Sequence, residues 1–211
     1  MYRRIHDGLS TAPTQQLWKR RILKVAFLIL PLCGCWFIGQ GSYIHAKAVF
    51  AQLLLESAWS KTLKGQKEVK PWPWADTWPI ARLSAPAYGI DHIVLAGASG
   101  STLAFGPGHL FNSAKPGQKG NVIISGHRDT HFNYLKNLQI GDHLELQSKS
   151  KTSAYQISHI QVIDKTKIEH IPVDSENKLV LITCYPFDAI QSGSPLRYMI
   201  TAEFKHSFIL S

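Results

Sequence analysis

Cysteine is scarce in this sequence, with three residues among 211, at positions 33, 35 and 184. So few cysteines exclude the disulfide framework that holds many small secreted domains together. Cys33 and Cys35 lie within an uncharged apolar run, which leaves Cys184 as the single cysteine in the rest of the chain. Cysteines of exported proteins usually pair, so a lone thiol in an exported domain would indicate reactivity. A buried, inert thiol is the alternative.

Acidic residues are also few: 14 Asp and Glu stand against 23 Lys and Arg, for a formal net charge of +9. Residues 1–24 hold six of the basic residues and one acidic residue, a net of +5, so the other 187 residues carry only +4. A basic cluster confined in this way indicates membrane topology and not a nucleic-acid surface. We find no acidic cluster with calcium-binding spacing and expect neither a metal nor a cofactor.

One long apolar run follows the basic cluster and occupies residues 25–44 without a charge. About twenty such residues suffice for one helical pass across a bilayer. We therefore predict a cytoplasmic segment at 1–24 and a transmembrane anchor at 25–44, with the bulk of the chain outside the cytoplasm. Two alternatives stay open, a cleaved signal peptide with its site at residues 46–48 and a lipoprotein-like site at Cys35.

The segment 45–79 is predicted to connect the anchor to a separate domain. Residues 45–64 have the apolar spacing of a helix that ends near Lys64 and Gly65. Three prolines then exclude regular helix or central strand between Pro71 and Pro79. We expect this Pro/Trp-rich arm to pack onto the domain, and a ligand-gating role is the alternative.

Residues 80–206 show short apolar runs separated by Gly-, Pro- and Asn-containing loops, without internal repeats or low-complexity segments. Seven or eight short strands with little helix between them predict a mainly β fold, either a closed barrel or a sandwich. Short helical turns are expected at 99–105 and 132–138. The predicted strands are 80–84, 90–95, 121–126, 143–147, 154–163, 178–184 and 196–204.

Cys184 ends one of these strands, and Arg197 opens the next. A thiolate at a strand end beside a fixed cation suits acyl transfer, because the thiolate attacks a carbonyl and the cation faces the oxygen that becomes negative. His127 supplies a base at the end of another predicted strand. Gly126 before it is expected to leave room for a substrate backbone.

These segments resemble the sortases, the membrane-anchored cysteine transpeptidases of bacterial surfaces. The matching residues are Gly-His-Arg-Asp at 126–129, Val-Leu-Ile-Thr-Cys at 180–184 and Arg197. Val180 replaces the threonine that usually opens the cysteine signature. Four longer segments resemble the proteobacterial class GN sortases: WPWADTWP, LAGASGSTLAFGPGH, GNVIISGHRDTHF and LVLITCYPFDA.

The resemblance implies a closed eight-stranded sortase-type β-barrel, preceded by the transmembrane helix and located on the periplasmic side of a bacterial inner membrane. It implies that Cys184 forms a thioester with an LPXTG-like C-terminal sorting signal of an exported protein. His127 would then be the general acid and base, and Arg197 would hold the substrate and the oxyanion. An amine acceptor of unknown identity would resolve the thioester. The subgroup implies an exported substrate with von Willebrand A-type and inter-α-trypsin-type domains.

Four further residues are candidates for supporting roles. Asp129 is expected to orient His127 or its loop, or to act only as a local cap. Thr183 points to the strand face opposite Cys184, so its hydroxyl is expected to contact backbone or a substrate pocket. His109 either lines the cleft or lies in an exposed turn. Tyr185 opens a loop that borders the signal-binding groove in sortases and is expected to influence substrate choice.

Three other functions compete with transpeptidation. His127 and His131 have the spacing of a zinc-protease helix, but the glutamate of that motif is missing and Gly126 disfavours a helix. A catalytically silent, membrane-anchored peptide-binding domain is the second. The third is a thiol endopeptidase, in which water and not an amine resolves the thioester.

Overall fold

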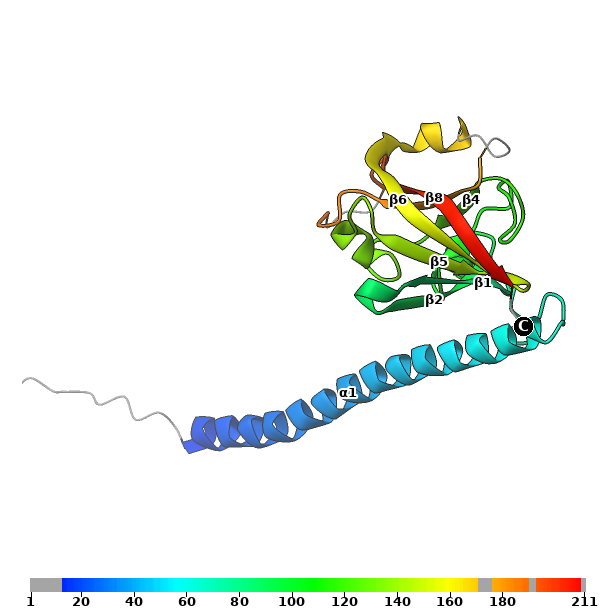
Figure 1. Ribbon diagram of the computed structural model, residues 1–211. Coiled ribbons are helices and arrows are strands. Elements are labelled where there is room, and N and C mark those ends of the chain that lie inside the picture. Colours follow the sequence, from blue (N-terminus) through cyan, green and yellow to red (C-terminus); the bar gives the residue numbers. More distant parts are fainter. Residues whose placement is uncertain (1–12, 171–175, 190–192, 210–211) are drawn as a thin grey trace, which may run out of the picture. The chain divides into compact units, whose positions relative to one another are not determined.

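The computed structural model of the chain describes residues 13–170, 176–189 and 193–209, and it divides the chain into two compact units, 1–49 and 50–211. A single helix of 51 residues, α1 (Pro13–Leu63), runs through the boundary between the units (Figure 1). Of the predicted cytoplasmic segment 1–24, residues 1–12 lie outside the described residues.

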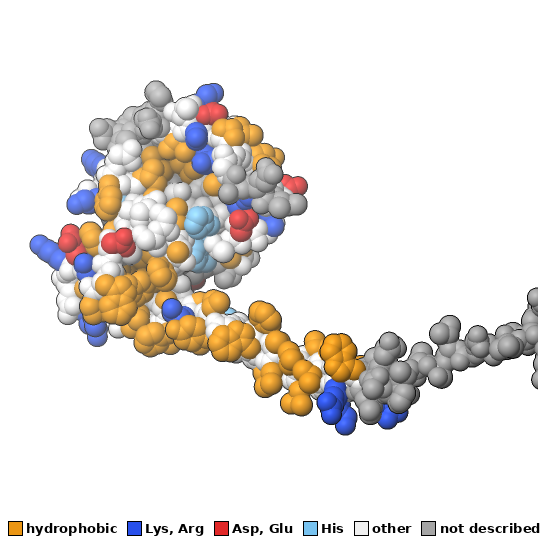
Figure 2. Space-filling model, turned by 180° about the vertical axis from the view of Figure 1, so that it is seen from behind, with side chains coloured by type: hydrophobic (Ala, Val, Ile, Leu, Met, Phe, Trp, Pro, Cys, Tyr) orange, Lys and Arg blue, Asp and Glu red, His pale blue; other side chains and the backbone are white. Residues whose placement is uncertain are grey.

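The described residues of the first unit, 13–49, all belong to α1. The large hydrophobic side chains of this part are exposed, and the helix is long and apolar enough from Arg20 onward to cross a membrane. Figure 2 shows hydrophobic side chains along this part of the helix and basic side chains at one end of it. These features are consistent with a membrane anchor or a signal sequence.

The second unit contains a closed eight-stranded β-barrel, as predicted (Figure 1), and the sandwich alternative is wrong. The strand order around the barrel is β1-β2-β3-β4-β7-β8-β6-β5. The pairs β2–β3 and β4–β7 are parallel, and the other pairs are antiparallel. The strands are β1 (Pro79–Ala85), β2 (Ile90–Ala96), β3 (Gly108–His109), β4 (Val122–Ser125), β5 (His143–Gln147), β6 (Lys151–Asp164), β7 (Lys178–Cys184) and β8 (Leu196–Ile209).

Most predicted strands lie within one or two residues of their observed ends, but β3, β6 and β8 differ. The two-residue β3 is too short to show an alternating pattern and was not expected. Strands β6 and β8 have 14 residues each because they pair with one another along their whole length, including an exposed polar end of β8 at 205–207. Two helical turns were expected, α2 (Gly100–Leu103) and the 3₁₀ turn η2 (Asn133–Asn137). The structure has two further 3₁₀ turns, η1 (Pro86–Tyr88) and η3 (Lys165–His170).

The strands that end at the predicted site are buried on both faces. Leu179 and Leu181 of β7 point into the barrel core, and Val180 and Ile182 pack outside it against Ile123 and other apolar residues. Each such side chain contributes about 1.5–3 kcal/mol when it is fully buried. The end of β7 is therefore held firmly, which positions the residues that follow from it.

The Pro/Trp-rich arm packs onto the barrel, and the last turns of α1 do so as well. Leu55 and Trp59 of α1 form a buried cluster with Ile93 and Leu95 of β2. From the arm, Thr77 Oγ1 donates a hydrogen bond to a β2 carbonyl at 2.8 Å. The predicted packing of the Pro/Trp-rich arm is therefore confirmed, and the packing of the last turns of α1 was not predicted.

Candidate active site

Cys184 and Arg197 lie directly opposite one another on β7 and β8. They form the last register pair of this antiparallel ladder. Opposed residues of an antiparallel pair project from the same face of the sheet, so the thiol and the guanidinium emerge side by side. The thiol is free and half-buried.

His127 lies on the other side of Cys184, beyond the end of β4. The parallel β4–β7 ladder ends at the pair Ser125–Ile182. The hydrogen bond from Gly126 N to Ile182 O, 3.1 Å long, continues the alignment past this pair. At the constant pairing offset of this ladder, His127 and Cys184 would be opposite one another two steps beyond it. The three predicted catalytic residues thus come from three neighbouring strand ends.

Gly126 has a different role from the one predicted for it. A Cβ atom on this glycine would lie 2.7–3.0 Å from ring atoms of Phe132, which is fully buried. The space next to the backbone is therefore filled by an aromatic ring and is not open to a substrate. Gly126 is needed because Phe132 packs against it, and this ring fixes the loop that carries His127.

Thr183 confirms the backbone alternative that the sequence left open. Its side chain is buried, and its Oγ1 donates to the carbonyl of Gly126 at 2.7 Å. This bond joins the residue before Cys184 to the residue before His127. It ties the two strand ends together on the side opposite the thiol.

Arg128 is a functional candidate that the sequence interpretation did not single out. Its side chain is only 7% exposed, which is rare for arginine. Nη1 donates to Pro186 O and Nη2 to Ala189 O, both at 2.6 Å, and Nε donates to Asp129 Oδ1 at 3.2 Å. Arg128 therefore connects the loop after His127 to the loop after Cys184. Its position next to the histidine was the only sequence signal, because burial of a charge leaves no periodic pattern.

Asp129 lies at the edge of this arrangement, with a side chain that is 70% exposed. Its carboxylate accepts a hydrogen bond from Nε of the neighbouring Arg128, and its expected role stays a prediction.

The guanidinium of Arg197 contacts its own loop. Nη1 donates to Ser194 O at 2.6 Å and to Leu196 O at 2.8 Å. A guanidinium carries five N–H donors, so Nε and Nη2 offer further donors to a substrate carbonyl. The two backbone bonds hold Arg197 at the mouth of the β7–β8 loop.

An aromatic group covers the start of the β7–β8 loop. Tyr185 stacks on Tyr198 with ring centroids 6.1 Å apart, and Phe187 meets Tyr198 edge-on at 5.1 Å. Burial raises the pKa of Tyr198, and the nearby Tyr185 adds a smaller contribution in the same direction, so the Tyr198 hydroxyl stays protonated at neutral pH. Tyr198 is the register partner of Thr183, so the Tyr185 ring stacks on the face of the sheet opposite the thiol. The expected influence of Tyr185 on substrate choice stays a prediction.

Two more histidines lie near His127, and Figure 2 shows histidine side chains gathered on one face of this unit. Burial lowers the pKa of His131, with a smaller contribution from the charge of His127, against a hydrogen bond to the Ala104 backbone. The ring of His92 contacts that of His131 at 5.7 Å. Burial also lowers the pKa of His92, so both rings are mainly neutral at pH 7.

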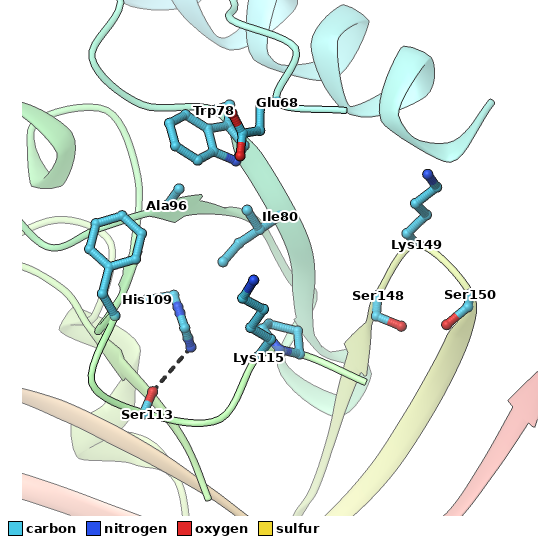
Figure 3. Close-up of a pocket in the computed structure, with 12 residues that line it drawn as sticks. Glu68, Trp78, Ile80, Ala96, His109, Ser113, Lys115, Ser148, Lys149 and Ser150 are labelled. Atoms are coloured by element: carbon cyan, nitrogen blue, oxygen red, sulfur yellow. Dashed lines mark hydrogen bonds between the residues drawn. The ribbon is translucent and has the colours of Figure 1, made fainter. Parts of the chain in front are cut away.

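His109 belongs to a different region of the barrel. It is 2% exposed in β3, and its Nε2 lies 2.9 Å from Ala114 O and 3.0 Å from Ser113 Oγ. It lines a cavity of about 470 Å³, together with Ser113, Lys115 and residues of the β5–β6 turn (Figure 3). The exposed-turn alternative is wrong for His109, because the residue is buried in β3. Its expected place in a substrate cleft stays a prediction.

The zinc-helix alternative also disagrees with the local structure. Residues 128–132 form turns after β4, so the spacing of His127 and His131 does not place them on one helix face. Within the described residues, no group of three His, Cys, Asp or Glu side chains is arranged to hold a metal ion.

Comparisons with known proteins agree with this geometry. A sortase domain model matches residues 83–205, or 123 of the 211 residues. Sortase D of Bacillus subtilis (strain 168) is 33% identical over 119 residues, which cover 56% of this chain and 60% of that protein.

Solved structures give the same result. The catalytic domain of SrtD from B. anthracis is 34% identical, with a TM-score of 0.53 over 62% of this chain and 89% of that one. Sortase C-3 from Streptococcus pneumoniae shares the fold, with a TM-score of 0.57, 23% identity and coverage of 77% and 85% of the two chains. This chain belongs to the sortase family.

Proposed function

We propose that the chain is a cysteine transpeptidase that cleaves an LPXTG-like sorting signal and transfers the acyl group to an amine. The observation that supports the proposal is the meeting of the ends of β4, β7 and β8: His127 follows β4, Cys184 ends β7 and Arg197 is opposite Cys184 on β8. A nucleophile, a proton carrier and a fixed cation are the groups that thioester-forming acyl transfer requires. Membership of the sortase family supports the same chemistry.

The first half-reaction begins with the Cys184 thiolate and the protonated ring of His127. The sulfur attacks the carbonyl carbon of the peptide bond that follows the threonine of the signal, and a C–S bond forms. Arg197 stabilises the negative oxygen. The C–N bond then breaks, and His127 gives its proton to the departing amine.

The second half-reaction reverses these roles. The neutral ring of His127 takes a proton from the incoming amine as its nitrogen attacks the thioester carbonyl. The C–S bond breaks and the thiolate returns. If water enters in place of the amine, the same steps give hydrolysis, which is the endopeptidase alternative.

The proposed location and partner rest on features of the sequence. The basic residues before the apolar helix favour an N-terminus inside and a catalytic domain on the periplasmic side of an inner membrane. The class GN assignment, and with it a substrate with von Willebrand A-type and inter-α-trypsin-type domains, rests on four sequence segments, whereas the relatives reported above are class D and class C sortases. Mass spectrometry of a Cys184→Ala strain against the unmodified strain would identify the exported protein that keeps its C-terminal signal.

An acceptor assay tests the proposed reaction. The full chain in detergent is incubated with an LPXTG-type peptide, with and without triglycine as the amine. We expect a ligated product that requires triglycine and is absent with Cys184→Ala. Peptide that is cleaved equally with and without triglycine, with no ligated product, would favour the endopeptidase. Peptide that binds but is neither cleaved nor ligated would favour the silent binding domain.

A further inference from the structure

Arg128 joins the two loops that carry the proposed nucleophile and the proposed proton carrier. It directly follows His127, and its two acceptors lie two and five residues after Cys184. We propose that Arg128 is a positioning residue that sets the separation of the His127 ring and the Cys184 thiol. This inference rests on the proposed function, because it assigns a purpose to that separation.

The geometry of the guanidinium is suited to this task. Its two terminal nitrogens reach two different carbonyls, Pro186 O and Ala189 O, at 2.6 Å each. The hydrogen bond from Ala189 N to Pro186 O closes a turn and helps to present both carbonyls to the same fork. Short bonds from a charged donor are stronger than neutral ones and have a narrower range of geometry. The start of the β7–β8 loop is therefore fixed relative to residue 128.

A second connection makes the separation rigid. The bond from Thr183 Oγ1 to Gly126 O links the same two segments one residue before the reactive side chains. Arg128 links them again one residue after His127. Cys184 and His127 thus lie between two cross-connections, and neither segment can shift without breaking one of them.

Burial of the charge argues against a role in stability alone. A buried cation loses its hydration, and apolar residues of similar size often stabilise a protein equally well. The carboxylate that contacts Arg128 is mostly exposed, so it offsets little of this cost. What an apolar residue could not provide is the directed pair of hydrogen bonds to the loop that follows the nucleophile.

Arg128→Lys is the main test, because lysine keeps the charge but cannot reach both carbonyls as a fork. Arg82→Lys is the matched control, since Arg82 also makes forked contacts, to Asp91 and Glu56, away from the site. The full-length variants in detergent are compared by urea unfolding and by cleavage of an LPXTG-type peptide. We expect Arg128→Lys to fold and to lower kcat by about 10- to 100-fold with KM changed less than about threefold, because small misplacements of reacting groups have effects of this size.

A readout without substrate separates this inference from the proposed function. Alkylation of Cys184 by iodoacetamide is followed against pH, and mass spectrometry of the Cys184 peptide excludes signal from Cys33 and Cys35. We expect Arg128→Lys to shift this pH profile and Arg82→Lys to leave it unchanged. If the parent chain cleaves no peptide, the proposed function fails, but the alkylation profile still decides the role of Arg128.

Three outcomes would overturn the inference. One is an Arg128→Lys protein with unchanged kcat per folded molecule and an unchanged alkylation profile. A second is a loss that appears only in KM, which would make Arg128 part of substrate binding. The third is failure to fold of both Arg128→Lys and Arg128→Met, the latter lacking the buried charge, which would show a structural role.

Discussion

At the scale of single residues, the site depends on contacts that lie behind the proposed catalytic side chains. Phe132 packs on Gly126, Thr183 bonds to the Gly126 carbonyl, and Arg128 holds the loop after Cys184. Each of these contacts lies within two residues of a proposed catalytic side chain. The reactive groups are thus fixed from behind and remain open in front.

We predict that Gly126→Ala destabilises the fold, because the added Cβ would overlap the buried ring of Phe132. Overpacking of this kind costs about 1–3 kcal/mol. Urea unfolding of the full chain in detergent measures the loss. Gly100→Ala is the control, since a Cβ there meets nothing within 4 Å; equal effects of the two substitutions would contradict the packing argument.

Stability is also predicted to decrease as the pH falls below about 6.5. Burial lowers the pKa of His109 and His131 in the folded chain below the ordinary value of 6.5. Between that value and the lower folded-state pKa, the unfolded chain binds more protons, so acid favours unfolding. Urea unfolding at pH 7.5 and 5.5 should show this loss. The loss of stability should be smaller in His109→Gln and His131→Gln. It should be unchanged in His143→Gln, the control, because His143 is exposed. An unchanged loss in all three variants would contradict the assignment of the effect to His109 and His131.

At the scale of elements, the meeting of β4, β7 and β8 creates the site. A parallel pair and an antiparallel pair share β7, so that two chain directions place side chains at one strand end. The junction is closed by the buried hydrogen bond of Thr183 and not by apolar packing alone.

Thr183→Val therefore tests the junction. Valine has the same shape but leaves the Gly126 carbonyl without this donor, and an unsatisfied buried group costs about 1–3 kcal/mol. We expect a lower urea midpoint and slower peptide cleavage, while Thr183→Ser, which keeps the hydroxyl, stays near the parent. Equal behaviour of the valine and serine variants would argue against the bond.

The sequence predicted the elements of the site where an apolar strand pattern ends at a reactive residue. The run from Leu179 to Ile182 is apolar and β-branched, so β7 and its terminal cysteine were predicted at the correct residues. His127 and Arg197 were predicted because strand ends collect reactive groups. The burial of Arg128 and the contact of Phe132 with Gly126 could not be predicted, since both depend on packing between segments that are distant in sequence or folded into turns.

His109 illustrates the opposite error at the same scale. A glycine-rich segment indicated a turn, but two residues of it pair with both β2 and β4 and become a strand. Pairing partners that lie far along the chain decide the state of so short a segment. The histidine is therefore buried in a strand and does not lie in an exposed turn.

At the scale of the whole molecule, the chain combines an apolar helix with a barrel unit that begins at Phe50. We predict that the full chain stays in the membrane fraction after alkaline carbonate extraction, whereas residues 50–211 are released. The exposed apolar side chains of α1 are the physical reason. If expression of the full chain instead gives a released product whose N-terminus lies near residue 49, the apolar segment is a cleaved signal peptide.

The central claim is that Cys184 forms an acyl-enzyme at the meeting of three strand ends. The most direct measurement is mass spectrometry of the full chain after brief exposure to an LPXTG-type peptide without added amine, followed by mapping of the modified residue. The account predicts the mass of the peptide's acyl part on Cys184, released by hydroxylamine, absent in Cys184→Ala and strongly reduced in His127→Ala. An adduct on Cys33 or Cys35, or cleavage of the peptide by the Cys184→Ala chain, would contradict it.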